Sequence, residues 1–232
     1  MEIINQDIEK LGLKYEVKFF SSDVPKIRCD PQSQKHEIGI PYYATLYSVR
    51  HELCHAYLAE NVHPNFAGSR VSPDSNPTDL ERKCKLLGWF DNAVVDVWVN
   101  DVFYDHWPAE LDSHKRIFLE DTVRFLGEGD YFRFTLPLVP LGLGSALADR
   151  RRHDMPEVDI SSVFAYLRHC GGEIIPQIGL IARELKKLPA LPRDETNAIK
   201  LYESCVTGLM GKLEIDFTPR LEPAEGKYAW RL

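Results

Sequence analysis

The sequence lacks the cysteine pattern of a disulfide-stabilised protein. Only five of its 232 residues are cysteines, no two of them have C-x-x-C spacing, and an odd number cannot all pair within one chain. We therefore expect reduced thiols, as in an intracellular protein, and no disulfide framework.

The sequence also lacks basic excess and long hydrophobic runs. A formal net charge of −7 argues against a nucleic-acid partner, and the one basic cluster, residues 150–153, is typical of a solvated helix end. The N-terminal residues are acidic and contain no apolar signal core. The most apolar stretch, residues 134–148, is too short to span a bilayer and contains two prolines and two glycines. We expect a cytoplasmic protein without nucleic-acid or membrane partners, whose oligomeric state the sequence leaves open.

The hydrophobic pattern predicts an α+β fold that is mainly helical. A small N-terminal sheet is expected beside a helix, with a core over residues 1–107 and a helical lobe over residues 108–232 of the same compact domain. Expected strands cover residues 15–20, 25–29 and 36–40, the last at a sheet edge because Pro41 ends it. Expected helices cover residues 3–13, 47–60, 79–87, 89–104, 112–126, 161–167, 174–187 and 193–212. Residues 61–77 are expected to form a loop, and residues 216–232 to be irregular.

The most informative segment of the chain is His51-Glu52-Leu53-Cys54-His55, which reads H-E-x-x-H. Two histidines four residues apart lie on one face of a helix, so both imidazoles can reach one metal ion. A glutamate between them can take a proton from a metal-activated water. The motif therefore predicts two zinc ligands, His51 and His55, and a general base, Glu52.

The residues around the motif favour a helix. Residues 47–60 contain no glycine or proline, and Val49, Leu53 and Ala56 form an apolar stripe at helical spacing. The alternative is a core helix whose two histidines are satisfied by hydrogen bonds. The intact motif in a helical context favours the metal site.

A catalytic zinc site normally has three protein ligands and one open position. In the metzincin pattern, H-E-x-x-H-x-x-G-x-x-H, the third ligand is a histidine. Leu58 and Asn61 occupy the glycine and final histidine positions here, so this pattern fails. His63 lies two residues further on and is a weaker candidate.

The stronger candidate for the third ligand is Asp96. The segment 89–103 is apolar all round, which is typical of a buried helix, yet Asn92, Asp96 and Asn100 recur every four residues. A buried carboxylate needs a cation, and metal-bound histidines would provide one nearby. The alternative is an Arg or Lys partner, or a wet groove. We predict that Asn92 and Asn100 orient the ligands. Asp91 and Asp101 are expected at helix ends or exposed.

These two segments resemble a known group of enzymes. An H-E-x-x-H helix followed by a helix with a carboxylate ligand looks like the gluzincin type of zincin, although the gluzincin E-x-x-x-D is Asp96-x-x-x-Asn100 here. A closer resemblance is to bacterial and archaeal metallopeptidases with N-x-A-x-D-x-x-[IV]-N, from which residues 92–100 depart only in an alanine one position earlier. The resemblance covers residues 36–104 and implies a zincin-like fold, a Zn²⁺ cofactor and a peptide or protein substrate.

The expected function is that of a zinc-dependent peptidase in which Glu52 is the general base. Zincins also use a side chain that stabilises the oxyanion, for which the sequence offers Tyr104, His106, His114 and Tyr131. Two alternatives remain at this point. One is a metal-binding regulatory or interaction protein without turnover, and the other is a metal hydrolase of a non-peptide amide.

Overall fold

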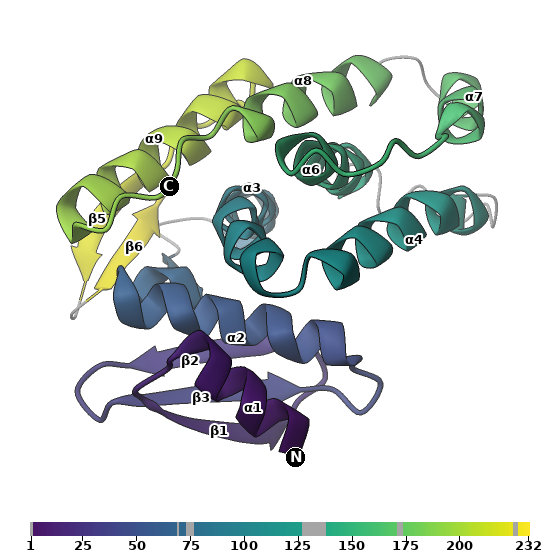
Figure 1. Ribbon diagram of the computed structural model, residues 1–232. Coiled ribbons are helices and arrows are strands. Elements are labelled where there is room, and N and C mark those ends of the chain that lie inside the picture. Colours follow the sequence, from purple (N-terminus) through teal and green to yellow (C-terminus); the bar gives the residue numbers. More distant parts are fainter. Residues whose placement is uncertain (1, 69, 73–76, 127–137, 171–173, 225–226) are drawn as a thin grey trace.

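The computed structural model describes residues 2–68, 70–72, 77–126, 138–170, 174–224 and 227–232. Over these residues the fold is α+β and mainly helical, as predicted. Figure 1 shows the N-terminal sheet at one end together with helix α1 (Glu2–Leu11), helix α2 (Leu46–Asn61) next to them, helix α3 (Pro77–His106) beyond α2, and the helices of the C-terminal half on the far side. Within this described part, no helix is long and apolar enough to cross a membrane.

The N-terminal sheet has the order β1-β3-β2, formed by β1 (Glu16–Ser21), β2 (Lys26–Asp30) and β3 (Lys35–Ile40). Strand β3 pairs parallel with β1 and antiparallel with β2. The prediction that residues 36–40 form an edge strand is therefore wrong. Pro41 follows the last paired residue of β3. Because neither ladder needs a donor at that position, proline's lack of an N–H removes no hydrogen bond from the sheet.

One face of this sheet is apolar and supports the helix that carries the motif. Cys29 and Ile38 point inward and are buried. Helices α1 (Glu2–Leu11) and α2 (Leu46–Asn61) lie against this sheet (Figure 1). Helix α2 begins where the Thr45 side chain accepts a hydrogen bond from the Ser48 N–H, as an N-cap does. The predicted motif helix is thus present and is fixed against the sheet.

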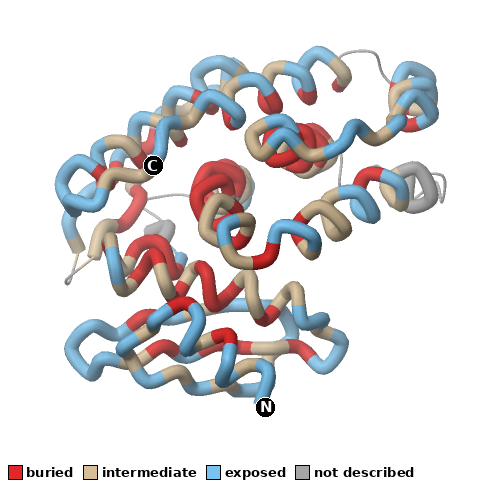
Figure 2. Tube along the Cα trace, in the orientation of Figure 1, coloured by how far each residue is buried: buried red, intermediate tan, exposed pale blue. Residues whose placement is uncertain are grey.

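Helix α3 (Pro77–His106) is one continuous 30-residue helix. The prediction of two helices separated near residue 88 is wrong. A glycine inside a helix costs only about 1 kcal/mol relative to alanine, and burial of Val94, Trp98 and Phe103 outweighs that cost. Figure 2 shows α3 as a largely buried helix, with other elements around it on several sides.

The helices of the C-terminal half pack around α3 and against each other. They are α4 (Pro108–Leu126), α6 (Leu138–Arg152), α7 (Ser161–Cys170), α8 (Ile174–Lys186) and α9 (Glu195–Lys212). Helices α6 and α8 approach closely at Gly144, where a Cβ atom would lie 2.5 Å from the Ile181 side chain. Glycine at this position therefore sets the distance between the two helices.

A second sheet joins distant parts of the chain in the order β4-β6-β5. Its strands are β4 (Arg70–Ser72), β5 (Arg220–Ala224) and β6 (Lys227–Arg231), and the short 3-10 helix η1 (Pro64–Ala67) precedes β4. The prediction of a loop over 61–77 is therefore wrong at η1 and β4, and the prediction of an irregular end over 216–232 is wrong at β5 and β6; residues 69, 73–76 and 225–226 lie outside the described residues. The strands are short, and β4 pairs with a strand more than 150 residues away, so local patterns carry little sign of them.

Asp91, in α3, is buried, so the expectation of an exposed or helix-end position is wrong. Its Oδ1 accepts hydrogen bonds from the Tyr202 hydroxyl of α9 and from the Trp230 Nε1–H of β6, the latter at 3.1 Å. These neutral donors satisfy the carboxylate and tie three elements together.

We expect Tyr202→Phe to lower the free energy of unfolding by about 1–3 kcal/mol, because it removes a donor from a buried carboxylate. Urea denaturation followed by circular dichroism measures this loss. Tyr42→Phe is the matched control, since Tyr42 is 99% exposed, and it should change stability by less than about 0.5 kcal/mol. Equal stability of the two variants would show that the Tyr202 hydroxyl does not support Asp91.

Candidate metal centre

Helix α2 presents the two histidines of the motif on one side. Its other side buries Leu53, Cys54 and Ala56 in the core. The side chains of His51 and His55 remain 18% and 13% exposed, and they face α3. The local sequence therefore orients both imidazoles away from the sheet.

Helix α3 brings Asp96 to the same point. Its neighbours Val95, Val97 and Trp98 are buried and fix the helix in the core. The Asp96 carboxylate lies 3.5 Å from His51 Nε2 and 3.3 Å from His55 Nε2, in both cases measured from Oδ1. The ligand atoms of the three residues all lie within 4.8 Å of one another.

The two distances to Asp96 would fit one bound metal ion, such as zinc. Ligands about 2.0–2.1 Å from a tetrahedral zinc ion lie about 3.4 Å apart. The two measured separations, 3.5 and 3.3 Å, bracket this value. Two imidazoles and a carboxylate are also ligands that zinc accepts, and they leave a fourth position open.

The hydrogen bond at the other side of His55 makes this fit more specific. Its Nδ1 lies 2.7 Å from the Phe66 carbonyl oxygen in η1, and a carbonyl can only accept, so Nδ1 carries a hydrogen. In the neutral ring, Nε2 then directs a lone pair at the Asp96 carboxylate oxygen. Two lone pairs at 3.3 Å repel unless a proton or a metal ion lies between them.

The electrostatics of the site show the same need for positive charge. Burial by itself would lower the pKa of His55, but the hydrogen bond with Asp96 and the charges of Asp96 and Glu52 raise it to about 9. Burial would likewise raise the pKa of Asp96, but the two neighbouring histidines hold it well below its usual range. The metal-free pair therefore retains a proton where a metal ion would otherwise bind.

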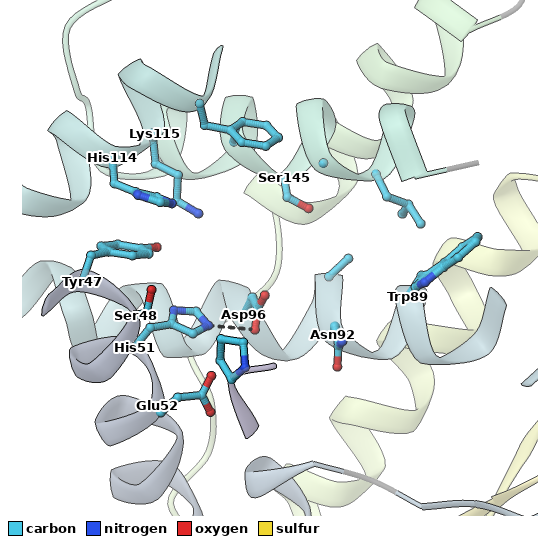
Figure 3. A pocket seen from close by; sticks show the side chains of 16 residues that line it. Tyr47, Ser48, His51, Glu52, Trp89, Asn92, Asp96, His114, Lys115 and Ser145 are labelled. Carbon is cyan, nitrogen blue, oxygen red and sulfur yellow. Dashed lines mark ion pairs between the residues drawn. The ribbon is translucent and has the colours of Figure 1, made fainter. Parts of the chain in front are cut away.

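His51 and Asp96 line a cavity of about 570 Å³ between α2, α3, α4 and α6, whereas His55 is not among its lining residues. Figure 3 shows His51, Glu52 and Asp96 on one side of it, with the ion pair of His51 and Asp96 drawn, and His114, Lys115 and Ser145 on the opposite side. Its lining residues are Pro25, Tyr47, Ser48, His51, Glu52, Trp89, Asn92, Ala93, Asp96, His114, Lys115, Phe118, Leu141, Gly142, Ser145 and Ala146. The Glu52 carboxylate is largely buried, yet it borders the cavity.

Other candidate residues lie in different places. Asn92 is exposed and lines the cavity, whereas Asn100 is buried and donates to Asp149 Oδ2 at 2.9 Å. His63 lies apart from the site, where its Nδ1 accepts from the Asn65 N–H as the N-cap of η1. The structure thus brings together His51, His55 and Asp96 and leaves His63 out of the cluster.

Among the four candidates for oxyanion stabilisation, only His114 lines the cavity in the described part of the chain. Tyr104 stacks on His153, and the His106 carbonyl accepts from Lys10. Tyr131 lies outside the described residues.

Tyr47 and Lys115 are among the cavity residues that sequence reasoning missed. Tyr47 stands four residues before His51, so helical spacing alone could have placed it beside the site. Lys115 has no such signal, because its helix meets α2 only through the tertiary fold.

Comparisons with protein-family models, with curated proteins and with solved structures give no match. The site is therefore interpreted from its own residues and geometry.

We expect the protein to bind about one zinc ion per chain, which elemental analysis after zinc incubation and gel filtration measures. Asp96→Asn removes charge and little volume, so it should lower zinc affinity at least about tenfold with the fold intact. Zinc should also raise the thermal unfolding midpoint of the unmodified protein more than that of the variant.

Asp105→Asn is the matched control for this substitution, because Asp105 is an exposed aspartate of the same helix. It should leave zinc affinity unchanged. An unmodified protein that retains no transition metal, or equal zinc affinity of Asp96→Asn and Asp105→Asn, would contradict the site.

Proposed function

We propose that the protein is a zinc-dependent hydrolase of the gluzincin-like zincin type that cleaves peptide bonds in a peptide or protein substrate. The observation that carries this proposal is the arrangement at His55: its Nδ1 donates to a backbone carbonyl while its Nε2 faces Asp96 at 3.3 Å. A zinc ion held by His51, His55 and Asp96 would lie between the His55 Nε2 lone pair and the carboxylate.

Zinc, when bound, supplies Lewis-acid chemistry and brings the pKa of a water near neutrality. The chain's own part begins with Glu52, whose carboxylate takes a proton from the water as the water oxygen attacks the substrate carbonyl carbon. Glu52 then returns the proton to the leaving amine nitrogen. Its position beside the ligand pair and at the cavity wall supports this role.

Two further features support hydrolysis over a purely structural metal site. Structural zinc sites close with four protein ligands, whereas the described residues supply a cluster of three. The cavity also leaves room for a substrate beside them. The free edge of β2 offers a place for an extended peptide to pair, since Pro25 directly before this strand lines the cavity.

Glu52→Gln should keep zinc and lose hydrolysis, because the amide cannot take the proton. A peptide library incubated with the zinc-loaded protein, with and without a chelator, is analysed by mass spectrometry for new termini. We expect chelator-sensitive cleavage by the unmodified protein and a loss of at least about 10²-fold in the variant.

Glu9→Gln, at an exposed glutamate of α1, is the matched control and should cleave normally. Loss of zinc from Glu52→Gln would instead identify Glu52 as a ligand and contradict its role as base. Metal binding without any new termini would argue for a non-peptide amide substrate or a binding function.

A further inference from the structure

The cavity wall opposite the candidate metal centre carries a lysine that has no part in the mechanism proposed above. Lys115 extends from α4, and its side chain is only 13% exposed. Figure 3 shows its amine directed into the cavity, in the region that the Tyr47 hydroxyl also faces, across from His51 and Asp96. A largely buried lysine needs a counterion, because removing its charge from water costs free energy.

A chain of polar contacts fixes the lysine in place. Its Nζ lies 2.7 Å from Asp149 Oδ2 in α6, and Asp149 is almost completely buried. The same oxygen accepts a hydrogen bond of 2.9 Å from Asn100 Nδ2 in α3. The ammonium group has three N–H donors, and Asp149 takes one of them. Two donors remain for the cavity.

The charges around Lys115 keep it protonated. Burial alone would lower its pKa, but the charges of Asp149 and Asp96 and the hydrogen bond with Asp149 raise it above its usual range. Burial also raises the pKa of Tyr47 to about 12, so the hydroxyl keeps its hydrogen. Two donors, one cationic and one neutral, therefore face the same space near neutral pH.

His114 lines the same cavity and positions Tyr47. Burial, with the charges of Lys115 and His51, lowers its pKa to about 4, so the ring is neutral near pH 7. Its ring stacks on Tyr47 with a centroid distance of 3.5 Å and an angle of 11°. His114 thus holds the tyrosine ring in position.

We propose that Lys115, together with the Tyr47 hydroxyl, binds the substrate oxygen that becomes negatively charged during hydrolysis. This proposal rests on the proposed function. As the water oxygen bonds to the carbonyl carbon, the π electron pair moves to the carbonyl oxygen and the water's proton goes to Glu52. Lys115 and Tyr47 donate hydrogen bonds to that oxygen and transfer no proton. The carbonyl re-forms when the C–N bond breaks and the amine takes the proton from Glu52.

The rival explanation is a structural ion pair that joins α4 to α6. The two roles predict different ligand affinities. Only the oxyanion-binding role makes affinity depend on whether a ligand places a charged oxygen near Lys115. Benzylphosphonate presents tetrahedral, negatively charged oxygens, whereas benzyl mercaptan presents the same benzyl group on a metal-binding sulfur and no oxygen.

The experiment measures Kd of both probes for the zinc-loaded protein by calorimetry. In Lys115→Met we expect benzylphosphonate to bind at least about tenfold more weakly, since a charge-assisted hydrogen bond is lost. The affinity for benzyl mercaptan and the zinc content should change less than about twofold. Where the peptide library yields a substrate, kcat should fall with little change in KM.

Two further variants separate recognition from folding. Lys115→Met with Asp149→Asn removes both charges of the pair, so it leaves no unpaired carboxylate if the single variant folds poorly. Arg152→Met is the matched control. Arg152 Nε lies 2.6 Å from Asp101 Oδ1 of α3, and neither residue lines the cavity. It should leave the ratio of the two affinities unchanged.

The outcomes distinguish the two proposals. If the unmodified protein binds both probes and every Lys115 variant binds them in the same ratio, the oxyanion role is overturned while the proposed function stands. If the unmodified protein binds neither zinc nor the mercaptan, the proposed function fails, and this inference fails with it.

Discussion

The site depends on one constraint: Asp96 sits on an otherwise apolar helix and faces two imidazoles whose hydrogens are already partly committed. His55 must donate from Nδ1 to the Phe66 carbonyl, so its other nitrogen meets the carboxylate as a base. Only a cation between them resolves this arrangement. The packing of α2 against α3 therefore holds the two imidazoles and the carboxylate together, and the core around them determines their separation.

The three polar residues spaced four apart on α3 have different partners. Asn92 lines the cavity and Asp96 faces the two histidines. Asn100 donates a hydrogen bond to Asp149, which forms an ion pair with Lys115. We predicted that Asn100 would orient a ligand, yet its hydrogen bond holds the carboxylate that holds the lysine. Helical spacing placed all three residues on one face, but the partner of each was decided by the helix that packs against it.

Local sequence information was enough for the motif helix and for Asp96, since both depend on spacing along a single helix. The motif sets His51 and His55 one turn apart, and the expected cost of an unpaired carboxylate drew attention to Asp96. Lys115 and the strand β6 were beyond reach because each acquires its role from a distant segment. Gly88 misled the prediction for α3, because the burial that overrides its helix-breaking tendency is a tertiary effect.

Asp91 and Asp96 show where the burial argument needs a second condition. Both lie on α3, and Asp91 is the more deeply buried of the two. Tyr202 and Trp230 donate hydrogen bonds to Asp91 Oδ1. Around Asp96 the nearest polar groups are imidazole nitrogens, one of which already has its hydrogen directed elsewhere. The two aspartates thus differ in their surroundings: the Asp96 side chain is 35% exposed and faces imidazole bases, whereas the buried Asp91 faces hydrogen-bond donors.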